Sequence, residues 1–378
     1  MAQTRAPNYH SEQTTWGVGP AFPNSFSHNG TENSFKMNTI SDAGVQLSQA
    51  IRQIKLCVPI FFDEGIYPSA GIHAERRNIY WRTIAVLCAS IKRARIPQLD
   101  ILVCTNETPP SDISYILDSC GVSFIHPHFS FQPPKLFAAF SGAFYLFDCM
   151  NHCRQTFSND DIFVFIDPDC IVMNNLEIIR HYSHQWPLIG YELEIEKDCK
   201  VNGCSRNDLL AFLHTMKDNS ILEAPKYFGG ELFIVNGEAL HSICNIIDRV
   251  WRLNTINFQS GNTTLKTEEH VISIALALCA ERVGIGNAII KRMWTRPSLR
   301  NVSAEDREYS IFHLPAEKRF AFQQLFYLIE SDLRNLVNLS DNEFGDLVAK
   351  SVHLKLSFIE NLLYFMYSLI KSTVKRAN

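Results

Sequence analysis

Short apolar runs alternate with longer amphipathic segments through the first half of the chain, a pattern that predicts strands separated by helices. We expect strands at 54–62, 100–105, 121–125 and 162–166, and helices at 77–95, 110–120 and 135–153. Strands that alternate with helices in this way form a mostly parallel sheet with helices on both faces. The pattern therefore predicts an α/β, Rossmann-like fold.

The second half of the chain is less regular. It predicts strands at 187–191, 231–235 and 309–313, and helices at 208–217, at 267–282 with Gly284 as a stop, and from 320 onward. Residues 1–40 are polar and aperiodic, which predicts a flexible tail, and a short helix is expected over 41–53. The chain thus divides into a tail (1–40), one α/β domain (41–320) and a helical C-terminal region (321–378).

The C-terminal region ends in a helix with a wide apolar stripe, which includes Phe358, Leu362, Phe365 and Leu369. Such a stripe most often packs on the chain's own core or on a partner subunit. Contact with a membrane surface is the alternative, because Lys371 and further basic residues follow the stripe.

Composition and charge narrow the class of protein. With 46% hydrophobic and 20% charged residues among 378, a packed globular core is expected. The net charge is −4 and the basic residues are scattered, which argues against a nucleic-acid partner. The 11 cysteines lie mostly in apolar runs, as buried thiols do in a reducing compartment. We see no signal peptide and no apolar run of about 20 residues, so we expect a cytoplasmic protein, peripheral at a membrane if the C-terminal stripe binds one.

The strand at 162–166 runs directly into Asp167-Pro168-Asp169. Ligands of open α/β folds bind at the carboxyl ends of the strands, where this pair of acids is expected to lie. Hard divalent cations prefer oxygen ligands and often bridge carboxylates to substrate phosphates. We therefore predict a metal site that holds a diphosphate, with an ordinary turn as the structural alternative.

An α/β half that ends in an apolar strand and D-x-D resembles the GT-A fold glycosyltransferases, loosely the glycogenin-like and bacterial retaining galactosyltransferase group. Three further segments resemble that superfamily: Lys135-Leu136-Phe137, Tyr227-Phe228-Gly229-Gly230-Glu231-Leu232 and Phe312-His313-Leu314-Pro315-Ala316-Glu317-Lys318. The last departs from the superfamily's H-x-x-G-x-x-K segment, because it lacks the glycine and its lysine comes one residue early. The resemblance spans roughly residues 54–320.

The resemblance implies a metal site for Mn²⁺ or Mg²⁺ with Asp167, Asp169 and His313 as ligands. It also implies that Lys135 and Lys318 lie near the donor phosphates, although each could equally be a surface charge. The half at about 54–170 would bind the nucleotide, and the half at about 171–320 would bind the acceptor.

Four residues are implied around the rest of the donor. Asp63, after the first strand, would meet the base or ribose. Gly229 and Gly230 would lie under the donor sugar, where the lack of a side chain lets the backbone approach a ligand. Glu231 would touch the sugar hydroxyls. The structural alternatives are a loop acid and a turn before a strand.

Glu268 and Glu269 begin the helix at 267–282. Acids in a first turn complement the helix dipole, which is the structural explanation. In inverting GT-A enzymes an acid at a comparable point deprotonates the acceptor hydroxyl, and Glu269 is the stronger candidate of the two for this role. A Glu269 base would mean inversion, whereas the His313 and Lys318 resemblance favours retention.

The predicted function is transfer of a sugar, of hexose type, from a nucleoside diphosphate, UDP being favoured, to a hydroxyl of a sugar, lipid-linked or protein acceptor. A sugar-nucleotide nucleotidyltransferase is one alternative, but the loop at 62–68 lacks the Gly-rich basic cluster of those enzymes. A binding protein with the same fold and no turnover is the other alternative.

Overall fold

A computed structural model describes residues 52–63, 73–134, 140–216, 221–296 and 299–354. Its centre is a sheet with strand order β3-β2-β1-β4-β7-β6-β8. The strands in that order are Val122–Ile125, Leu99–Thr105, Ile54–Ile60, Ile162–Ile166, Tyr227–Asn236, Leu188–Leu193 and Val283–Ile285. The first four are mutually parallel, β7 is antiparallel to both of its neighbours, and β8 is parallel to β6. The predicted α/β fold with a mostly parallel sheet is confirmed.

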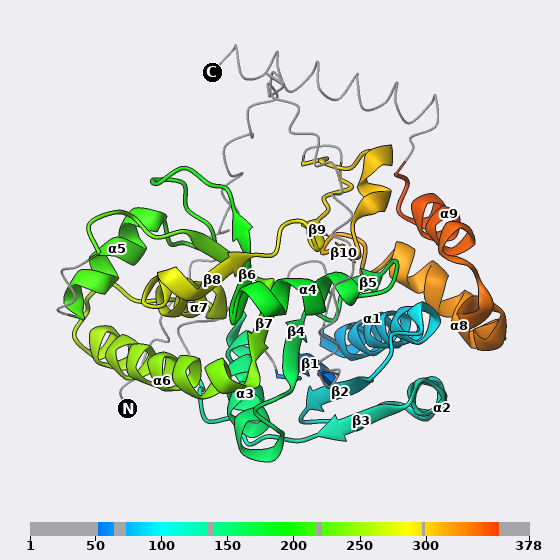
Figure 1. The fold of residues 1–378 in the computed structure, drawn as a ribbon, viewed down its shortest axis with the longest axis horizontal. Helices are drawn as coiled ribbons and strands as arrows, with labels where there is room; N and C mark the ends of the chain where they lie inside the picture. The colour runs from blue at the N-terminus through cyan, green and yellow to red at the C-terminus, as the bar shows by residue number, and fades with distance from the viewer. Residues whose placement is uncertain (1–51, 64–72, 135–139, 217–220, 297–298, 355–378) are drawn as a thin grey trace, which may run out of the picture.

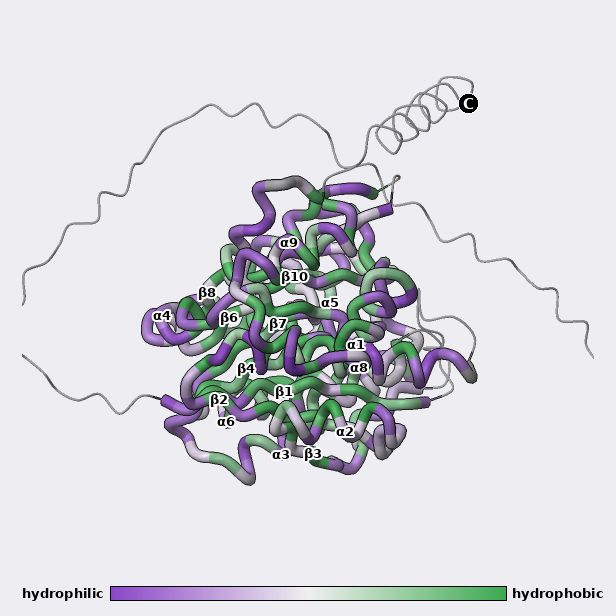
Figure 2. Tube along the Cα trace, turned by 90° about the vertical axis from the view of Figure 1, so that its right-hand side faces the viewer, coloured by the Kyte–Doolittle hydropathy of each residue, from purple (hydrophilic) through white to green (hydrophobic). Residues whose placement is uncertain are grey.

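Helices cover both faces of the sheet (Figure 1). One face carries α1 (His73–Ala94), α2 (Ser111–Cys120), α4 (Glu177–Gln185) and α8 (Ala321–Asn338), with α9 (Asp341–Ser351) against α8. The other carries α3 (Tyr145–Thr156), α5 (Arg206–Thr215), α6 (Gly237–Gln259) and α7 (Glu268–Ala277). Figure 2 shows the hydrophobic residues gathered along the central strands between these layers.

The strand β4 is buried on both faces because alternate side chains point to opposite sides of a strand. Ile162, Val164 and Ile166 join the core under α1, whereas Phe163 and Phe165 join the core under α6 and α7. This double burial explains why the sequence shows a continuous apolar run and not an alternating one.

A second, small sheet lies beside the carboxyl end of β4. Its order is β5 (Cys170–Val172), β10 (Ile311–His313) and β9 (Ile290–Arg292). β10 is antiparallel to β5 and parallel to β9. Segments far apart in sequence thus meet next to Asp167 and Asp169.

Several element boundaries differ from those expected. The helix predicted over 135–153 begins at Tyr145, after a 3₁₀ turn at Ser141–Phe144, and residues 135–139 lie outside the described part. Gly284 lies within β8 and does not terminate α7, which ends at Ala277. Gly229 and Gly230 lie inside β7, which begins at Tyr227 and not after the glycines. The 23-residue helix α6 was not predicted, although its buried Leu240, Ile243, Ile247 and Val250 have helical spacing.

The N-terminal tail, the helix expected over 41–53 apart from its last two residues, and the apolar stripe from Phe358 lie outside the described residues. Among the helices of the described part, none is long and apolar enough to cross a membrane.

Arg93, near the end of α1, connects three parts of the fold. Its buried guanidinium donates to the carbonyl of Met173 (2.6 Å), which follows β5, and to Asp341 Oδ1 (2.5 Å), at the start of α9. It also lies 4.5 Å from the centroid of the Phe344 ring. The guanidinium thus fixes α9 against α1 and against the small sheet.

We expect Arg93→Ala to lower the free energy of unfolding by about 2–3 kcal/mol, because hydrogen bonds from a charged donor are lost and a buried carbonyl loses its partner. Urea unfolding followed by circular dichroism measures this change. The control is Arg307→Ala, which removes an exposed ion pair with Asp346 and should cost under about 1 kcal/mol. Equal losses in the two variants would contradict the role given to Arg93.

Candidate metal centre

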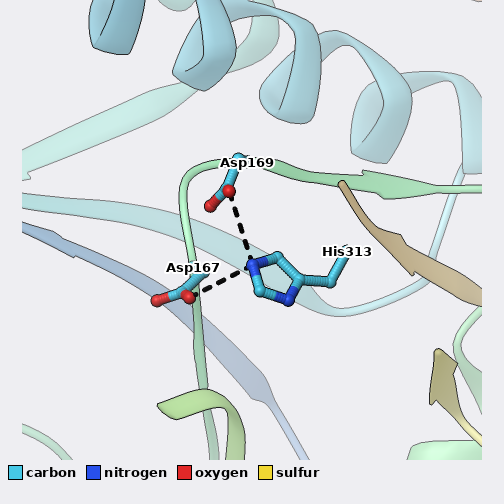
Figure 3. Close-up of side chains that lie close together, drawn as sticks. All are labelled: Asp167, Asp169 and His313. Carbon is cyan, nitrogen blue, oxygen red and sulfur yellow. Dashed lines mark ion pairs between the residues drawn. The ribbon is translucent and has the colours of Figure 1, made fainter. Parts of the chain in front are cut away.

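Asp167, Asp169 and His313 point toward one another at the carboxyl end of β4 (Figure 3). Nε2 of His313 lies 3.4 Å from Oδ2 of Asp167 and 3.4 Å from Oδ2 of Asp169. One ligand atom from each of the three residues falls within 4.8 Å of the others. Asp169 and His313 are buried, and Asp167 is partly exposed. The arrangement could hold a metal ion that remains open to a ligand on one side.

Strand register explains why these residues meet. Asp169 directly precedes β5, whose first residue, Cys170, pairs with His313 at the end of β10. The backbone N–H of Leu314 then donates to the carbonyl of Asp169 (3.0 Å). His313 also pairs with Arg292 at the end of β9, so a single row across the small sheet brings both side chains to the acids.

The centre concentrates charge in a buried setting. Burial opposes ionisation of Asp169, but the adjacent Lys318 and His313 cations lower the pKa of its carboxyl. Nζ of Lys318 donates to Oδ2 of Asp169 and lies 5.8 Å from the centroid of the Tyr80 ring. Burial opposes the charge of His313 as well, yet the carboxylates of Asp169 and Glu231 raise its pKa to about 9.

Glu231 lies behind His313 with no exposed surface. Its carboxylate accepts from Arg292 Nε (2.5 Å) and Nη2 (2.6 Å) in a bidentate pair, and Oε1 lies 3.5 Å from His313 Nδ1. Burial opposes its charge, but the Arg292 guanidinium lowers the pKa of Glu231 to about 2. A Cβ at Gly229 would overlap Oε2 of Glu231 and come within 2.8 Å of Arg292 Nη2. Glycine at 229 therefore leaves the room that this ion pair needs.

The start of α7 brings two further acids to the centre. Oε1 of Glu269 accepts from Arg292 Nη2 (2.9 Å) and from the N–H of Gly230 (3.3 Å). Its Oε2 accepts from Asn202 Nδ2 (2.9 Å) and Tyr227 OH (3.2 Å). Glu269 is thus a buried carboxylate with donors on both oxygens.

Glu268, in contrast, lines a small pocket at the site. The wall of this pocket is formed by Pro59, Gly142, Ala143, Leu146, Phe165, Ile166, Asp167, Gly230 and Glu268. A Cβ at Gly230 would lie 2.5 Å from Oε1 of Glu268, so this glycine makes space for the carboxyl group. Oε2 of Glu268 has no hydrogen-bond partner among the described residues. Burial and the nearby carboxylates of Glu269 and Asp167 raise the pKa of Glu268.

His270 fixes the loop that leads into α7. Its Nδ1 accepts from the backbone N–H groups of Lys266 (3.0 Å) and Thr267 (3.3 Å), so Nε2 carries the proton toward the carbonyl of Val201 (3.2 Å). Burial lowers its pKa to about 4. A neutral imidazole therefore positions the helix start that carries Glu268 and Glu269.

Asp63 and Lys135 are the remaining predicted site residues. Asp63 accepts from Ser141 Oγ (2.6 Å), the residue before the pocket-lining Gly142, and lies 3.5 Å from Arg76 Nη2. Lys135 lies outside the described residues. Arg292, which pairs with both Glu231 and Glu269, was not predicted from the sequence. No local motif marks it, because its place depends on how a three-residue strand pairs with β10.

Comparison with known proteins gives structural likeness only. No protein family and no curated protein matches the chain in sequence. The apo form of mouse xyloside xylosyltransferase 1 aligns with a TM-score of 0.43 at 10% identity, over 70% of this chain and 97% of the other. The galactosyltransferase LgtC, in complex with donor and acceptor sugar analogues, aligns with 0.43 at 10%, over 79% and 96%. The bifunctional glycosyltransferase WbbM, in its apo structure, aligns with 0.45 at 11%, over 80% and 53%. These three solved structures are of glycosyltransferases.

Gly229→Ala should lower the free energy of unfolding by about 1–3 kcal/mol, because the added methyl group forces the Glu231–Arg292 pair apart in a packed interior. Chemical denaturation measures the change. Gly345→Ala is the matched control, since that helical glycine has open space around its Cβ position and alanine should be neutral or stabilising there. A Gly229→Ala variant as stable as the wild type would show that the pair does not need this space.

Acid should weaken the fold through His270. Its folded pKa, about 4, lies below the unfolded value of about 6.5, so its contribution is complete above pH 6.5 and is lost as the pH falls toward 4. The shift corresponds to roughly 3 kcal/mol. Urea unfolding at pH 4 to 7 should show a steeper loss for the wild type than for His270→Gln. Parallel pH profiles of the two proteins would refute the assignment.

Proposed function

We propose that this protein is a metal-dependent GT-A glycosyltransferase that moves a sugar from a nucleoside diphosphate to an acceptor hydroxyl. The observation that carries the proposal is the Asp167–Asp169–His313 cluster at the carboxyl end of β4, with Lys318 beside it. Crevices at the carboxyl ends of strands are where open α/β sheets bind their ligands. UDP is the nucleotide that the sequence resemblance favours.

The side chains of the cluster fit a divalent cation. Two carboxylates and an imidazole approach one point, and Nδ1 of His313 faces the Glu231 carboxylate, as expected when Nε2 is the metal-binding atom. Carboxylates suit Mg²⁺ and Mn²⁺, and the imidazole favours the transition metal, so we propose Mn²⁺ with Mg²⁺ as the alternative. The bound ion would stabilise the leaving diphosphate as a Lewis acid.

Lys318 supplies the second positive charge. Its ammonium group is within hydrogen-bond reach of Asp169 and would donate to donor phosphate oxygens at the same place. Asp63, which accepts from Ser141 next to the pocket-lining Gly142, would meet the ribose or base. Lys135 remains a proposed phosphate contact on the strength of the resemblance alone.

The pocket beside the cluster is the proposed place of the transferred sugar. Gly142, Ala143 and Gly230 have little or no side chain and so leave space along the pocket wall. Asp167 and Glu268 supply carboxyl groups that can bind hydroxyls. Glu269 stays a candidate base for the acceptor, but its hydrogen bonds from four donors suit a positioning role better. Of the two glutamates, Glu268 is the one that lines the pocket. Glu231, fully buried, suits support of His313 better than direct contact with sugar hydroxyls.

The proposed setting is the cytoplasm, with a sugar, a lipid-linked sugar or a protein as acceptor. All eleven cysteines are free thiols, which fits a reducing compartment. Residues 54–170 would form the nucleotide-binding half and residues 171–320 the acceptor half. Membrane or subunit contact through the stripe at Phe358 remains part of the proposal from the sequence.

Asp167→Asn should reduce Mn²⁺-dependent release of UDP from UDP-sugars at least about 100-fold, because the transition state loses several kcal/mol of charge stabilisation. Asp169→Asn should have the same effect, with a lower melting temperature because Lys318 loses its buried partner. The assay follows product release from a panel of nucleotide-sugars with Mn²⁺ and with a chelator.

The control is Asp112→Asn, an exposed acid in the first turn of α2, which should leave turnover unchanged. Pyrophosphate as the product would identify a nucleotidyltransferase instead. Calorimetric binding of UDP and Mn²⁺ with no sugar released would identify a binding protein. Full turnover in Asp167→Asn would refute the metal site.

A further inference from the structure

We infer that Glu231 and Arg292 are positioning residues that hold His313 in the orientation and tautomer needed to bind the metal ion. The inference rests on the proposed function, because it assumes that the Asp167–Asp169–His313 cluster holds an ion. It goes further in giving the pair formed by the fully buried Glu231 and the partly buried Arg292 a role in metal affinity.

The imidazole of His313 lies between two sets of carboxylates. Its Nε2 is 3.4 Å from both Asp167 Oδ2 and Asp169 Oδ2, and its Nδ1 is 3.5 Å from Glu231 Oε1. A metal-binding histidine uses one nitrogen for the ion and directs the N–H of the other to a carboxylate or carbonyl. At 3.5 Å the two atoms are a charge contact and not a hydrogen bond. Once an ion replaces the proton on Nε2, Glu231 would favour the tautomer with the proton on Nδ1, which leaves the Nε2 lone pair to the ion.

Arg292 stabilises the charged form of the buried Glu231 carboxylate. A buried carboxylate with no partner is strongly destabilising, and Glu231 has no exposed surface. The two parallel hydrogen bonds from Arg292 fix the plane of the carboxylate, which in turn fixes where Oε1 meets the imidazole. Arg292 and His313 are paired at the ends of two strands of the small sheet, so both side chains meet the same Glu231 carboxylate.

The same guanidinium also reaches the start of α7. Nη2 of Arg292 donates to Oε2 of Glu231 and to Oε1 of Glu269, the residue that follows the pocket-lining Glu268. The chain of contacts thus runs from the metal ligand His313 through Glu231 and Arg292 to the wall of the pocket. A purely structural pair would join β7 to β9 and have no effect on the affinity of the ion.

The experiment measures Mn²⁺ binding to the full chain by electron paramagnetic resonance of the free ion, with and without UDP. We expect Glu231→Gln to bind Mn²⁺ about 10- to 100-fold more weakly than the wild type, the range typical of lost carboxylate support for a histidine ligand. Arg292→Lys keeps the charge but loses the bidentate geometry, and it should show a smaller loss. Lys291→Gln breaks the neighbouring ion pair with Asp306 and should leave Mn²⁺ affinity unchanged.

The double variant Glu231→Gln/Arg292→Gln removes both charges of the pair and leaves Glu269 with its three neutral donors, so it should fold even if a single substitution does not. Weak Mn²⁺ binding by the folded double variant would support the inference. Wild-type affinity in the folded variants, with or without a change in melting temperature, would overturn the inference and leave the proposed function standing. A wild-type chain that binds no Mn²⁺ in either condition would overturn both.

Discussion

Charge compensation in a buried place is the constraint on which the site depends. Asp169 and Glu231 are both drawn into the interior, and each carboxylate would cost several kcal/mol there without a cation. Lys318 and His313 neutralise the first, and Arg292 neutralises the second. Asp169 and Glu231 can therefore be buried as carboxylates only because the small sheet and the turn after it supply the matching cations.

The small sheet supplies two of the cations that this constraint requires. β9 and β10 have three residues each. Ile290, Ile311 and Phe312 are buried in the core, and the last residues of the two strands, Arg292 and His313, lie in adjacent register positions. The two glycines of β7 complete the arrangement by leaving room for the carboxylates of Glu231 and Glu268. A strand that appears weakened by glycine is thus fitted to the acids around it.

The sequence predicted those parts of the site that local pattern controls. An apolar run ending in two acids located Asp167 and Asp169, and the segment after Phe312 located His313 and Lys318, which the structure brings to the same carboxylate. It could not reveal Arg292, because the pairing of a three-residue strand depends on contacts distant in sequence. It could not reveal that Glu231 is fully buried either, since that depends on how β7 is inserted between β4 and β6. The helix α6 could have been predicted from the sequence, because its apolar residues have regular helical spacing.

The ion pair between Asp169 and Lys318 joins residues 149 positions apart. During synthesis the ribosome delivers domains from the N-terminus onward. A nascent chain that has released β4 but not the turn after β10 has its acids without their cations, so the cluster cannot close until most of the polypeptide has emerged. Incomplete chains therefore hold these acids unneutralised, and the order of synthesis makes the closing of the cluster one of the last steps of folding.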